Sequence, residues 1–221
     1  MVRVTGDVVR ELQMVFVTTF HVHGGPLEGD EAALARYFPT PDDPGDLPAI
    51  VVGTRHTRDV SALQATREMI DQARERIDIT NPYFTEDELV DRIVAAAERG
   101  VKVRVLVAEE SNSAVHSAAL RHDYGRMLDA GIEVWEYPDA VVHGKVLVAD
   151  DRVMFGTINL DAWALYRAYE VAALVDDAET ADLFESRLFE PDIAMSRPGV
   201  APTDEWTRFK DWLADGLSYF L

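Results

Sequence analysis

The chain has 221 residues, and 48% of them are hydrophobic, which is enough for one sizeable core and excludes a mainly disordered protein. It contains no cysteine, which excludes disulfides, thiolate catalysis and thiolate-bound metals. Its 21 basic residues against 40 acidic ones give a formal net charge of −19, a balance that disfavours binding to nucleic acid.

Membrane-spanning and targeting segments are not expected. No apolar run reaches the roughly 18–20 residues that a transmembrane helix needs. The N-terminal segment also lacks the charged start, apolar middle and cleavage site of a signal peptide. We therefore expect a soluble, cytoplasmic protein whose contact with a membrane is peripheral.

The first segment, residues 1–48, is predicted to hold one helix and a long connection. Apolar residues at helical intervals indicate an amphipathic helix from Asp7 to Phe20. The stretch from Gly24 to Pro48 is rich in Gly, Pro and Asp, which favours a surface connection with a short helix at Glu31 to Tyr37.

From residue 49 the chain alternates between strand-like and helical patterns. Repeated helix-then-strand units favour an α/β domain in which a mostly parallel mixed sheet is flanked by helices on both faces. The predicted strands are Ala49–Val52, Ile77–Thr80, Val101–Val107 and Ile132–Tyr137, and the predicted helices are Val60–Arg76, Glu86–Arg99 and Ser113–Ala130.

The pattern changes after Pro138. Two strand-like runs, Lys145–Ala149 and Arg152–Phe155, follow each other so closely that we expect a hairpin with its turn at residues 150–151. A further strand at Tyr169–Val175 and a helix at Ala178–Phe189 complete a domain that we bound at residues 49–195.

Residues 196–221 are predicted to form a C-terminal amphipathic helix. Its apolar side chains recur at helical intervals, and its polar face is mainly acidic where a membrane-surface helix is usually basic. We therefore expect the apolar stripe to pack onto the domain or onto a second subunit. The stripe comprises Trp206, Phe209, Trp212, Leu213, Leu217 and Phe220.

The hairpin carries the residues with the clearest chemistry. His143 and Lys145 are two apart before a strand and so face one side, and Thr157 and Asn159 have the same spacing after the next strand. A hairpin would bring an imidazole, an ammonium, a hydroxyl and an amide together, with Gly156 allowing the backbone to approach closely. This set suits in-line attack on a phosphodiester, in which negative charge develops on phosphate oxygens.

The pattern resembles the motif of the phospholipase D superfamily, H-x-K-x4-D followed by G-[S/T]-x-N. It is matched at six positions: His143, Lys145, Asp150, Gly156, Thr157 and Asn159. The chain departs from the family in one respect, because five residues separate Asp150 from Gly156 where the family usually has six. A hairpin turn shortened by one residue would accommodate the difference.

The flanking sequence resembles the second half of bacterial cardiolipin synthases. The matching features include the run 81–84 (Asn-Pro-Tyr-Phe), the run 130–132 (Ala-Gly-Ile) and Glu170 ahead of Asp176. Residues 1–48 resemble the link that enters that half. The resemblance covers nearly the whole chain, so what this chain lacks is the family's first lobe with its own motif.

The resemblance implies a role for each residue. His143 would be the nucleophile that forms a phosphohistidine, or the general acid, and Glu170 would accept a hydrogen bond from it. Lys145, Thr157, Asn159 and Gly156 would bind the phosphate, and Asp150 would complete the catalytic set in a supporting role. We expect no metal and no cofactor, and therefore no inhibition by chelators.

Because the family mechanism uses two facing motifs, three functions stay open. The first is a homodimeric enzyme that transfers phosphatidyl groups between molecules of a phospholipid like phosphatidylglycerol, or hydrolyses it. The second is a dimeric nuclease of the same superfamily, which the charge disfavours. The third is a non-catalytic half that needs a separate first-lobe subunit.

Overall fold

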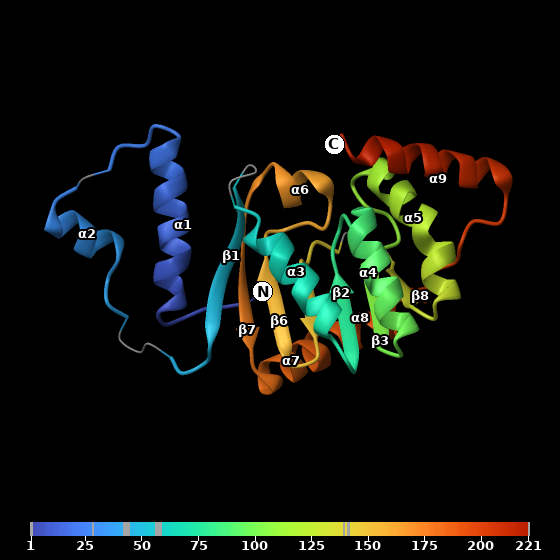
Figure 1. Cartoon of the computed structure of the whole chain (residues 1–221), viewed down its shortest axis with the longest axis horizontal. Coiled ribbons are helices and arrows are strands. Elements are labelled where there is room, and N and C mark those ends of the chain that lie inside the picture. The colour runs from blue at the N-terminus through green and yellow to red at the C-terminus, as the bar shows by residue number, and fades with distance from the viewer. Residues whose placement is uncertain are drawn as a thin grey trace.

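The computed structural model describes residues 2–27, 29–41, 45–55, 59–138, 140 and 142–220 (Figure 1). The helices are α1 Val8–Val22, α2 Glu31–Tyr37, α3 Ser61–Gln72, α4 Asp87–Glu98, α5 Ala114–Asp129, α6 Ala162–Tyr166, α7 Ala178–Phe184, the π-helical turn η1 Glu185–Phe189, α8 Glu190–Met195 and α9 Glu205–Ser218. The strands are β1 Ala49–Arg55, β2 Arg76–Thr80, β3 Lys102–Ala108, β4 Glu133–Tyr137, β5 Val146–Ala149, β6 Arg152–Gly156, β7 Tyr169–Asp176 and β8 Arg197–Pro198.

All described strands belong to one eight-stranded mixed sheet in the order β1-β7-β6-β5-β2-β3-β4-β8. Strands β2, β3 and β4 are parallel neighbours, whereas every other neighbouring pair is antiparallel. The expectation of a mixed sheet flanked by helices is confirmed. The expectation that the sheet is mostly parallel is wrong: only β2-β3 and β3-β4 are parallel pairs, because β2, β5, β6, β7 and β1 alternate in direction and β8 runs antiparallel to β4.

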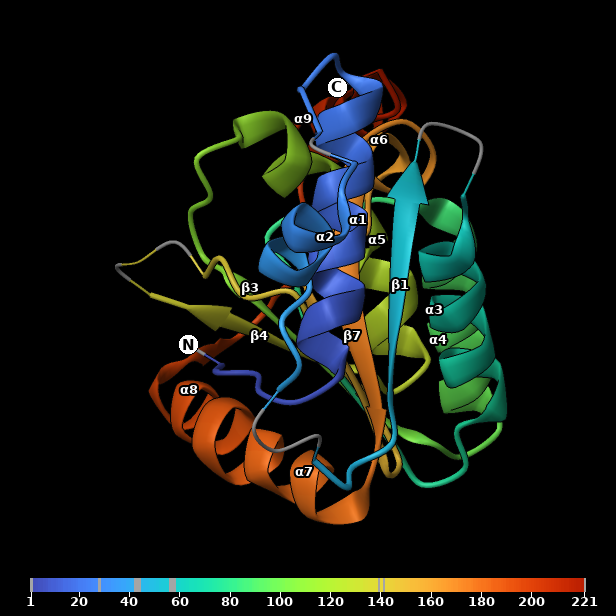
Figure 2. The ribbon, with the colours of Figure 1, turned by 90° about the vertical axis from the view of Figure 1, so that its left-hand side faces the viewer.

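Alternating side chains give the sheet two apolar faces. Ile77 and Ile79 of β2 point into the larger core, which α3, α4 and α5 cover. Leu106 of β3 and Val148 of β5 point to the opposite face, where they meet Phe189 of η1. Figure 2 shows the two helix layers on either side of the sheet. The expectation of helices on both faces is therefore confirmed.

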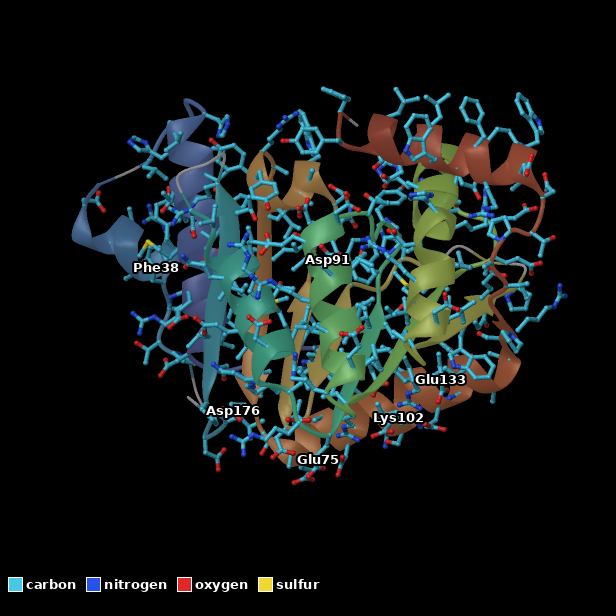
Figure 3. All side chains as sticks on the ribbon, turned by 45° about the vertical axis from the view of Figure 1, so that its right-hand side comes forward. Phe38, Glu75, Asp91, Lys102, Glu133 and Asp176 are labelled. Atoms are coloured by element: carbon cyan, nitrogen blue, oxygen red, sulfur yellow. The ribbon has the colours of Figure 1, made fainter. Side chains whose placement is uncertain are left out.

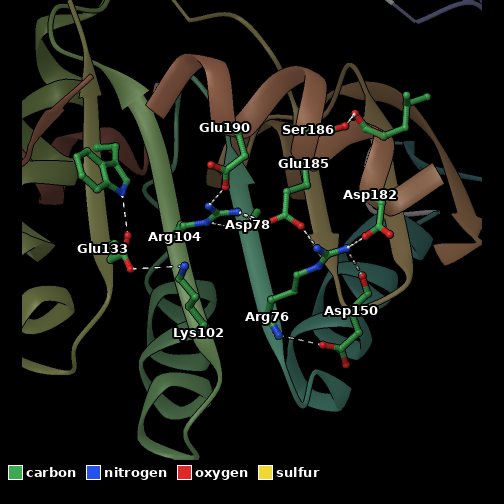
Figure 4. Close-up of polar contacts among 12 residues, drawn as sticks. Arg76, Asp78, Lys102, Arg104, Glu133, Asp150, Asp182, Glu185, Ser186 and Glu190 are labelled. Atoms are coloured by element: carbon green, nitrogen blue, oxygen red, sulfur yellow. Dashed lines mark hydrogen bonds and ion pairs between the residues drawn. The ribbon is translucent and has the colours of Figure 1, made fainter. Parts of the chain in front are cut away.

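An ion-pair network lies beneath η1 and α8 on the second face (Figure 4). The guanidinium of Arg104 donates to Asp78 on the neighbouring strand, with Nη2 and Oδ2 2.9 Å apart, and to Glu185 and Glu190 at 3.0 and 2.6 Å. The hydrogen bond to Asp78 is the main cause that raises the pKa of Arg104. Asp78 is 1% exposed, so Arg104 supplies the positive charge that this buried carboxylate requires.

The β5-β6 hairpin turns over two residues, with Ala149 opposite Arg152, as expected. Asp150 adopts a left-handed conformation there, with φ of 53°. Its carboxylate accepts hydrogen bonds from the backbone N–H groups of Arg74, Glu75 and Arg76 at 2.9–3.0 Å. The side chain therefore ties the turn to the start of β2.

The C-terminal segment differs from expectation in two ways. The helix predicted to end at Phe189 continues through η1 and α8 to Met195, and β8 then adds a short strand beside β4. Helix α9 packs on α5 through small and polar residues such as Asp211 and Ala214. Its apolar stripe points outward, as the α9 side chains in Figure 3 do, and the expectation that this stripe packs onto the domain is wrong.

We predict that Arg104→Met destabilises the fold by about 3–5 kcal/mol, because it leaves Asp78 charged, buried and unpaired. Adding Asp78→Leu should recover most of that loss, since the pair is then replaced by apolar groups. Urea unfolding of both variants measures the difference. A loss below about 1 kcal/mol in the single variant would contradict the importance given to this pair.

We also predict that Gly156→Ala destabilises the fold by about 1–3 kcal/mol or more. A Cβ atom at residue 156 would lie 2.2 Å from the carbonyl oxygen of Val171, which is backbone and has little freedom to move. Gly125→Ala in α5 is the matched control, because no atom lies within 4 Å of its added Cβ. The control should be neutral or stabilising by up to about 1 kcal/mol.

Candidate functional site

The candidate site lies where β5 begins, β6 ends and β7 begins. These three strands are neighbours and alternate in direction, so these ends meet at one end of the sheet. The N–H of Gly156 donates to the carbonyl of Lys145 at 3.2 Å, and the N–H of Thr157 donates to the carbonyl of Val171 at 2.9 Å. The fold therefore brings the two halves of the sequence motif together, as the hairpin predicts.

His143 and Lys145 lie side by side at the mouth of this site. The Nζ atom of Lys145 is 3.1 Å from Nδ1 and 3.2 Å from Nε2 of His143, and it donates to the His143 carbonyl at 3.1 Å. The imidazole is exposed and the lysine half-buried. Burial lowers the pKa of Lys145, and the carboxylates of Glu170 and Asp161 oppose that shift.

Thr157 and Glu170 form the opposite wall. The Thr157 hydroxyl donates to the Glu170 carboxylate and accepts from the N–H of Val171 at 3.1 Å. Burial raises the pKa of Glu170, the Thr157 hydrogen bond opposes this, and the negative charge of Asp161 adds to it. The resemblance implied that Glu170 would bind His143. Among the hydrogen bonds of the described residues, the partner of its carboxylate is Thr157 instead.

The backbone on either side of Asn159 is held by the side chain of Asn81. The Asn81 side chain donates to the carbonyl of Ile158 at 3.1 Å and accepts from the N–H of Leu160 at 3.3 Å, so it holds both neighbours of Asn159. Within the described part of the chain, Oδ1 of Asn159 is buried without a hydrogen-bond partner. Asn81, noted from the sequence only as part of a matching run, therefore positions the segment that carries Asn159.

Two residues beside Asn159 were not predicted from the sequence. Asp161 caps α6, accepting from the N–H of Ala164 at 2.7 Å, and it attracts the buried imidazole of His116. Burial raises the pKa of Asp161 and lowers that of His116, and their mutual attraction opposes both shifts. Because His116 lies on α5 and about forty residues before Asp161, no local pattern in the sequence connects them.

Asp150 does not join the site. It follows the last residue of β5, whereas Lys145 precedes the first, so the two side chains lie at opposite ends of that strand. The place of Asp150 in the catalytic set is therefore a correction. Its carboxylate is engaged by three backbone N–H groups at the turn, which lower its pKa against the opposing effect of burial.

An open groove of about 960 Å³ adjoins the site at Glu170. Its lining residues come from α1, the segment around Phe38, strand β1 and Glu170 of β7. Apolar side chains of Met14, Val15 and Phe38 line it together with the guanidinium groups of Arg10 and Arg55. The lining also contains Asp7, Glu11, Asp59 and Glu170, and Arg55 is paired with Asp59 at 3.0 Å. The groove therefore offers a surface for hydrocarbon close to the candidate catalytic groups, with charges of both signs along it.

The curated relatives of this chain include cardiolipin synthases from several bacteria. Cardiolipin synthase A from Yersinia pseudotuberculosis serotype O:1b (strain IP 31758) is 28% identical over 100% of this chain, and so is that from Serratia proteamaculans (strain 568). The chain spans about half the length of these curated relatives, 46% in each case.

Solved structures share the fold at low sequence identity. Nuc from Salmonella typhimurium, a phospholipase D family member, has a TM-score of 0.61 at 22% identity, over 70% of this chain and 99% of that one. Phosphatidylserine synthase from Haemophilus influenzae Rd KW20 has a TM-score of 0.62 at 17% identity, over 80% of this chain and 49% of that one.

A family described as "Cardiolipin synthase, PLD-like domain" matches residues 66–191, which is more than half of the chain and includes every residue of the candidate site. With the motif, the fold and the relatives in agreement, the chain belongs to this family of phospholipase D-like domains.

Proposed function

We propose that this chain is one lobe of a phospholipid-transferring enzyme that works through a phosphohistidine. The observation that carries the proposal is the convergence of His143, Lys145, Thr157 and Glu170 at one end of the sheet. Membership of the family described as cardiolipin synthase-like supports a phosphatidyl group as the group transferred.

In the proposed reaction, a ring nitrogen of His143 attacks the phosphorus of a phosphatidylglycerol-like lipid. The phosphorus–oxygen bond to the head-group alcohol breaks, and a second histidine protonates the alcohol as it leaves. An acceptor alcohol then attacks the phosphohistidine, giving its proton to the second histidine and freeing His143. Lys145, Thr157 and Asn159 would stabilise the charge on the phosphate oxygens. Water as acceptor would give hydrolysis.

The second histidine has to come from another lobe. We propose that a second copy of this chain supplies it, so that two His143 side chains face each other across a two-fold axis. The exposure of His143 supports this arrangement, because a partner can reach it. A separate first-lobe subunit would meet the same requirement, since the curated relatives are about twice as long as this chain.

The groove beside Glu170 supports a lipid substrate over nucleic acid. Its apolar lining offers burial to acyl chains, which a nucleic-acid backbone does not need. The net charge of −19 would also repel a polyanion. A nuclease of the same superfamily is the second candidate function, favoured only by the shared phosphodiester chemistry.

The exposed face of α9 offers a route to the membrane. Trp206, Phe209 and Trp212 stack along it with centroids 5.9 Å apart, and each is at least half exposed. The guanidinium of Arg167, which follows α6, lies 5.6 Å from the ring of Tyr219, so the C-terminal end of α9 lies next to the end of α6. We propose that the aromatic face lies in a lipid surface.

We predict that His143→Ala lowers turnover of phosphatidylglycerol in mixed micelles by about 10³-fold or more without loss of folding. His21→Ala, an exposed histidine on α1, is the control and should stay active. Mass spectrometry of cardiolipin and glycerol, with circular dichroism, measures both effects. Retention of activity in the His143 variant would refute the catalytic assignment.

Mixing the wild-type protein with the His143→Ala variant tests whether two chains share one active site. If an active unit needs two wild-type chains, an equilibrated equimolar mixture should retain about one quarter of the wild-type activity, against about one half for independent chains. If the protein has no activity on lipid but cleaves DNA in a reaction that requires His143, the nuclease function replaces the lipid proposal. If the protein is inactive on both substrates and light scattering shows a monomer, the result favours a single lobe that needs a separate first-lobe subunit.

We predict that Trp206→Ser with Phe209→Ser lowers binding to phosphatidylglycerol–phosphatidylcholine vesicles by about tenfold or more. The binding should rise with salt, because salt screens the repulsion between the net charge of −19 and the anionic vesicle surface while the insertion of aromatic side chains persists. Leu183→Ser is the control, since this exposed residue lies on α7, far from α9 in Figure 1. Vesicle flotation measures the partition, and equal loss in the control would count against α9.

A further inference from the structure

Three carboxylates from distant parts of the chain meet between α4, α5 and α9. Asp87 opens α4, Asp123 lies within α5, and Asp215 lies in α9. One oxygen from each lies within 4.8 Å of the other two. The sequence, in which these residues are widely separated, predicted no clustered carboxylates, and in this respect the prediction was wrong.

Asp123 has an oxygen that needs a partner. The residue is 2% exposed, its Oδ1 accepts from Nε of Arg126 at 2.8 Å, and its Oδ2 is buried without any hydrogen bond in the described part of the chain. Buried carboxylate oxygens in folded proteins nearly always have a hydrogen-bond partner, because leaving one unpaired lowers the stability of the fold by about 1–3 kcal/mol or more. The unpaired Oδ2 therefore indicates a ligand at this position.

The surrounding charges leave the cluster negative. Arg126 is the main cation, and it also donates to Asp87 at 3.3 Å and to Asp91. Asp91, labelled on α4 in Figure 3, adds a fourth carboxylate to the same pocket. Burial, then the charges of Asp87 and Asp123, raise the pKa of Asp215 to about 6, whereas His122 and Arg126 oppose the shift. One guanidinium does not neutralise four carboxylates.

The ligand chemistry points to a hard divalent cation. Carboxylate oxygens are preferred by Ca²⁺ and Mg²⁺. Mutual distances of up to 4.8 Å allow the three oxygens to share one ion of either kind. Ca²⁺ tolerates irregular coordination and several carboxylates, whereas Mg²⁺ demands near-ideal octahedral geometry and keeps most of its water, so an all-carboxylate site from three helices suits Ca²⁺ better. The pocket that contains the three residues has a volume of about 410 Å³, which leaves room for water ligands.

We propose that Asp87, Asp123 and Asp215 bind a divalent cation, with Ca²⁺ preferred over Mg²⁺. The ion would join α9 to α4 and α5, a role separate from catalysis at His143. The proposal concerns the attachment of α9 and no reacting group, so it does not depend on the catalysis proposed at His143, although α9 also carries the aromatic face proposed to contact lipid.

The test is thermal unfolding of the full chain, stripped with EDTA and dialysed, in CaCl₂, in MgCl₂ or in NaCl of equal ionic strength. The NaCl arm is necessary because any salt screens a net charge of −19. Ca²⁺ at about a hundredfold excess over its Kd should raise Tm by about 5 °C or more beyond the NaCl value. Calorimetric titration with CaCl₂ should show one site per chain.

Asp215→Asn should remove this response. Without Ca²⁺ the variant should unfold at the same Tm as wild type or higher, because a like charge has been removed, so a lost response is not a failure to fold. Asp91→Asn is the matched control, with the same change in charge on the same pocket but outside the three ligands, and it should keep the response.

The cation proposal is tested by the Tm and the titration alone, whereas the proposed function is tested by lipid turnover and its loss in His143→Ala, so the failure of one and the failure of the other are distinguishable. No Tm difference between CaCl₂ and NaCl, or the same difference in Asp215→Asn as in wild type, would overturn the proposal.

Discussion

The two-residue turn between β5 and β6 is the constraint on which the candidate site depends. Asp150 holds it by accepting hydrogen bonds from the backbone N–H groups of residues 74–76, which fixes the end of β5 beside the start of β2. With Ala149 opposite Arg152, the ladder delivers Val146 opposite Phe155 and leaves Lys145 hydrogen-bonded to Gly156 at the far end. A two-residue turn thus lets the motif assemble one strand length away with five residues between Asp150 and Gly156.

The two faces of the sheet are stabilised in different ways. The face under α3, α4 and α5 is a continuous apolar core, whereas the face under η1 and α8 centres on the buried Asp78–Arg104 pair. The register of the parallel strands β2 and β3 places Asp78 opposite Arg104. The helices packed on this face add Glu185 and Glu190 as further partners of Arg104. Arg76 joins the same helices to the turn, pairing with Asp182 at 2.8 Å and with Glu185. A polar network therefore couples the second helix layer to the hairpin that sets the site.

The sequence predicted most elements because their signals are local. Runs of β-branched residues, helix caps and the two-residue spacing of His143 and Lys145 are read within a few positions. Features that depend on distant residues were missed: the Asp161–His116 contact, the replacement of a His143–Glu170 bond by one to Thr157, and the three-helix carboxylate cluster. The helix expected to end at Phe189 continues because the π-helical turn η1 precedes Pro191, which sits in the first turn of α8.

Strand β8 limits how two lobes can associate. It pairs with β4 over only two residues, and Pro198 brings no N–H to the outer side of the sheet. Gly199, which follows, donates its N–H inward to Val134 at 2.8 Å. A neighbouring chain therefore finds no ladder to extend at that margin, which protects the protein from open-ended sheet growth. At this edge, any contact with a neighbouring chain would therefore be made through side chains.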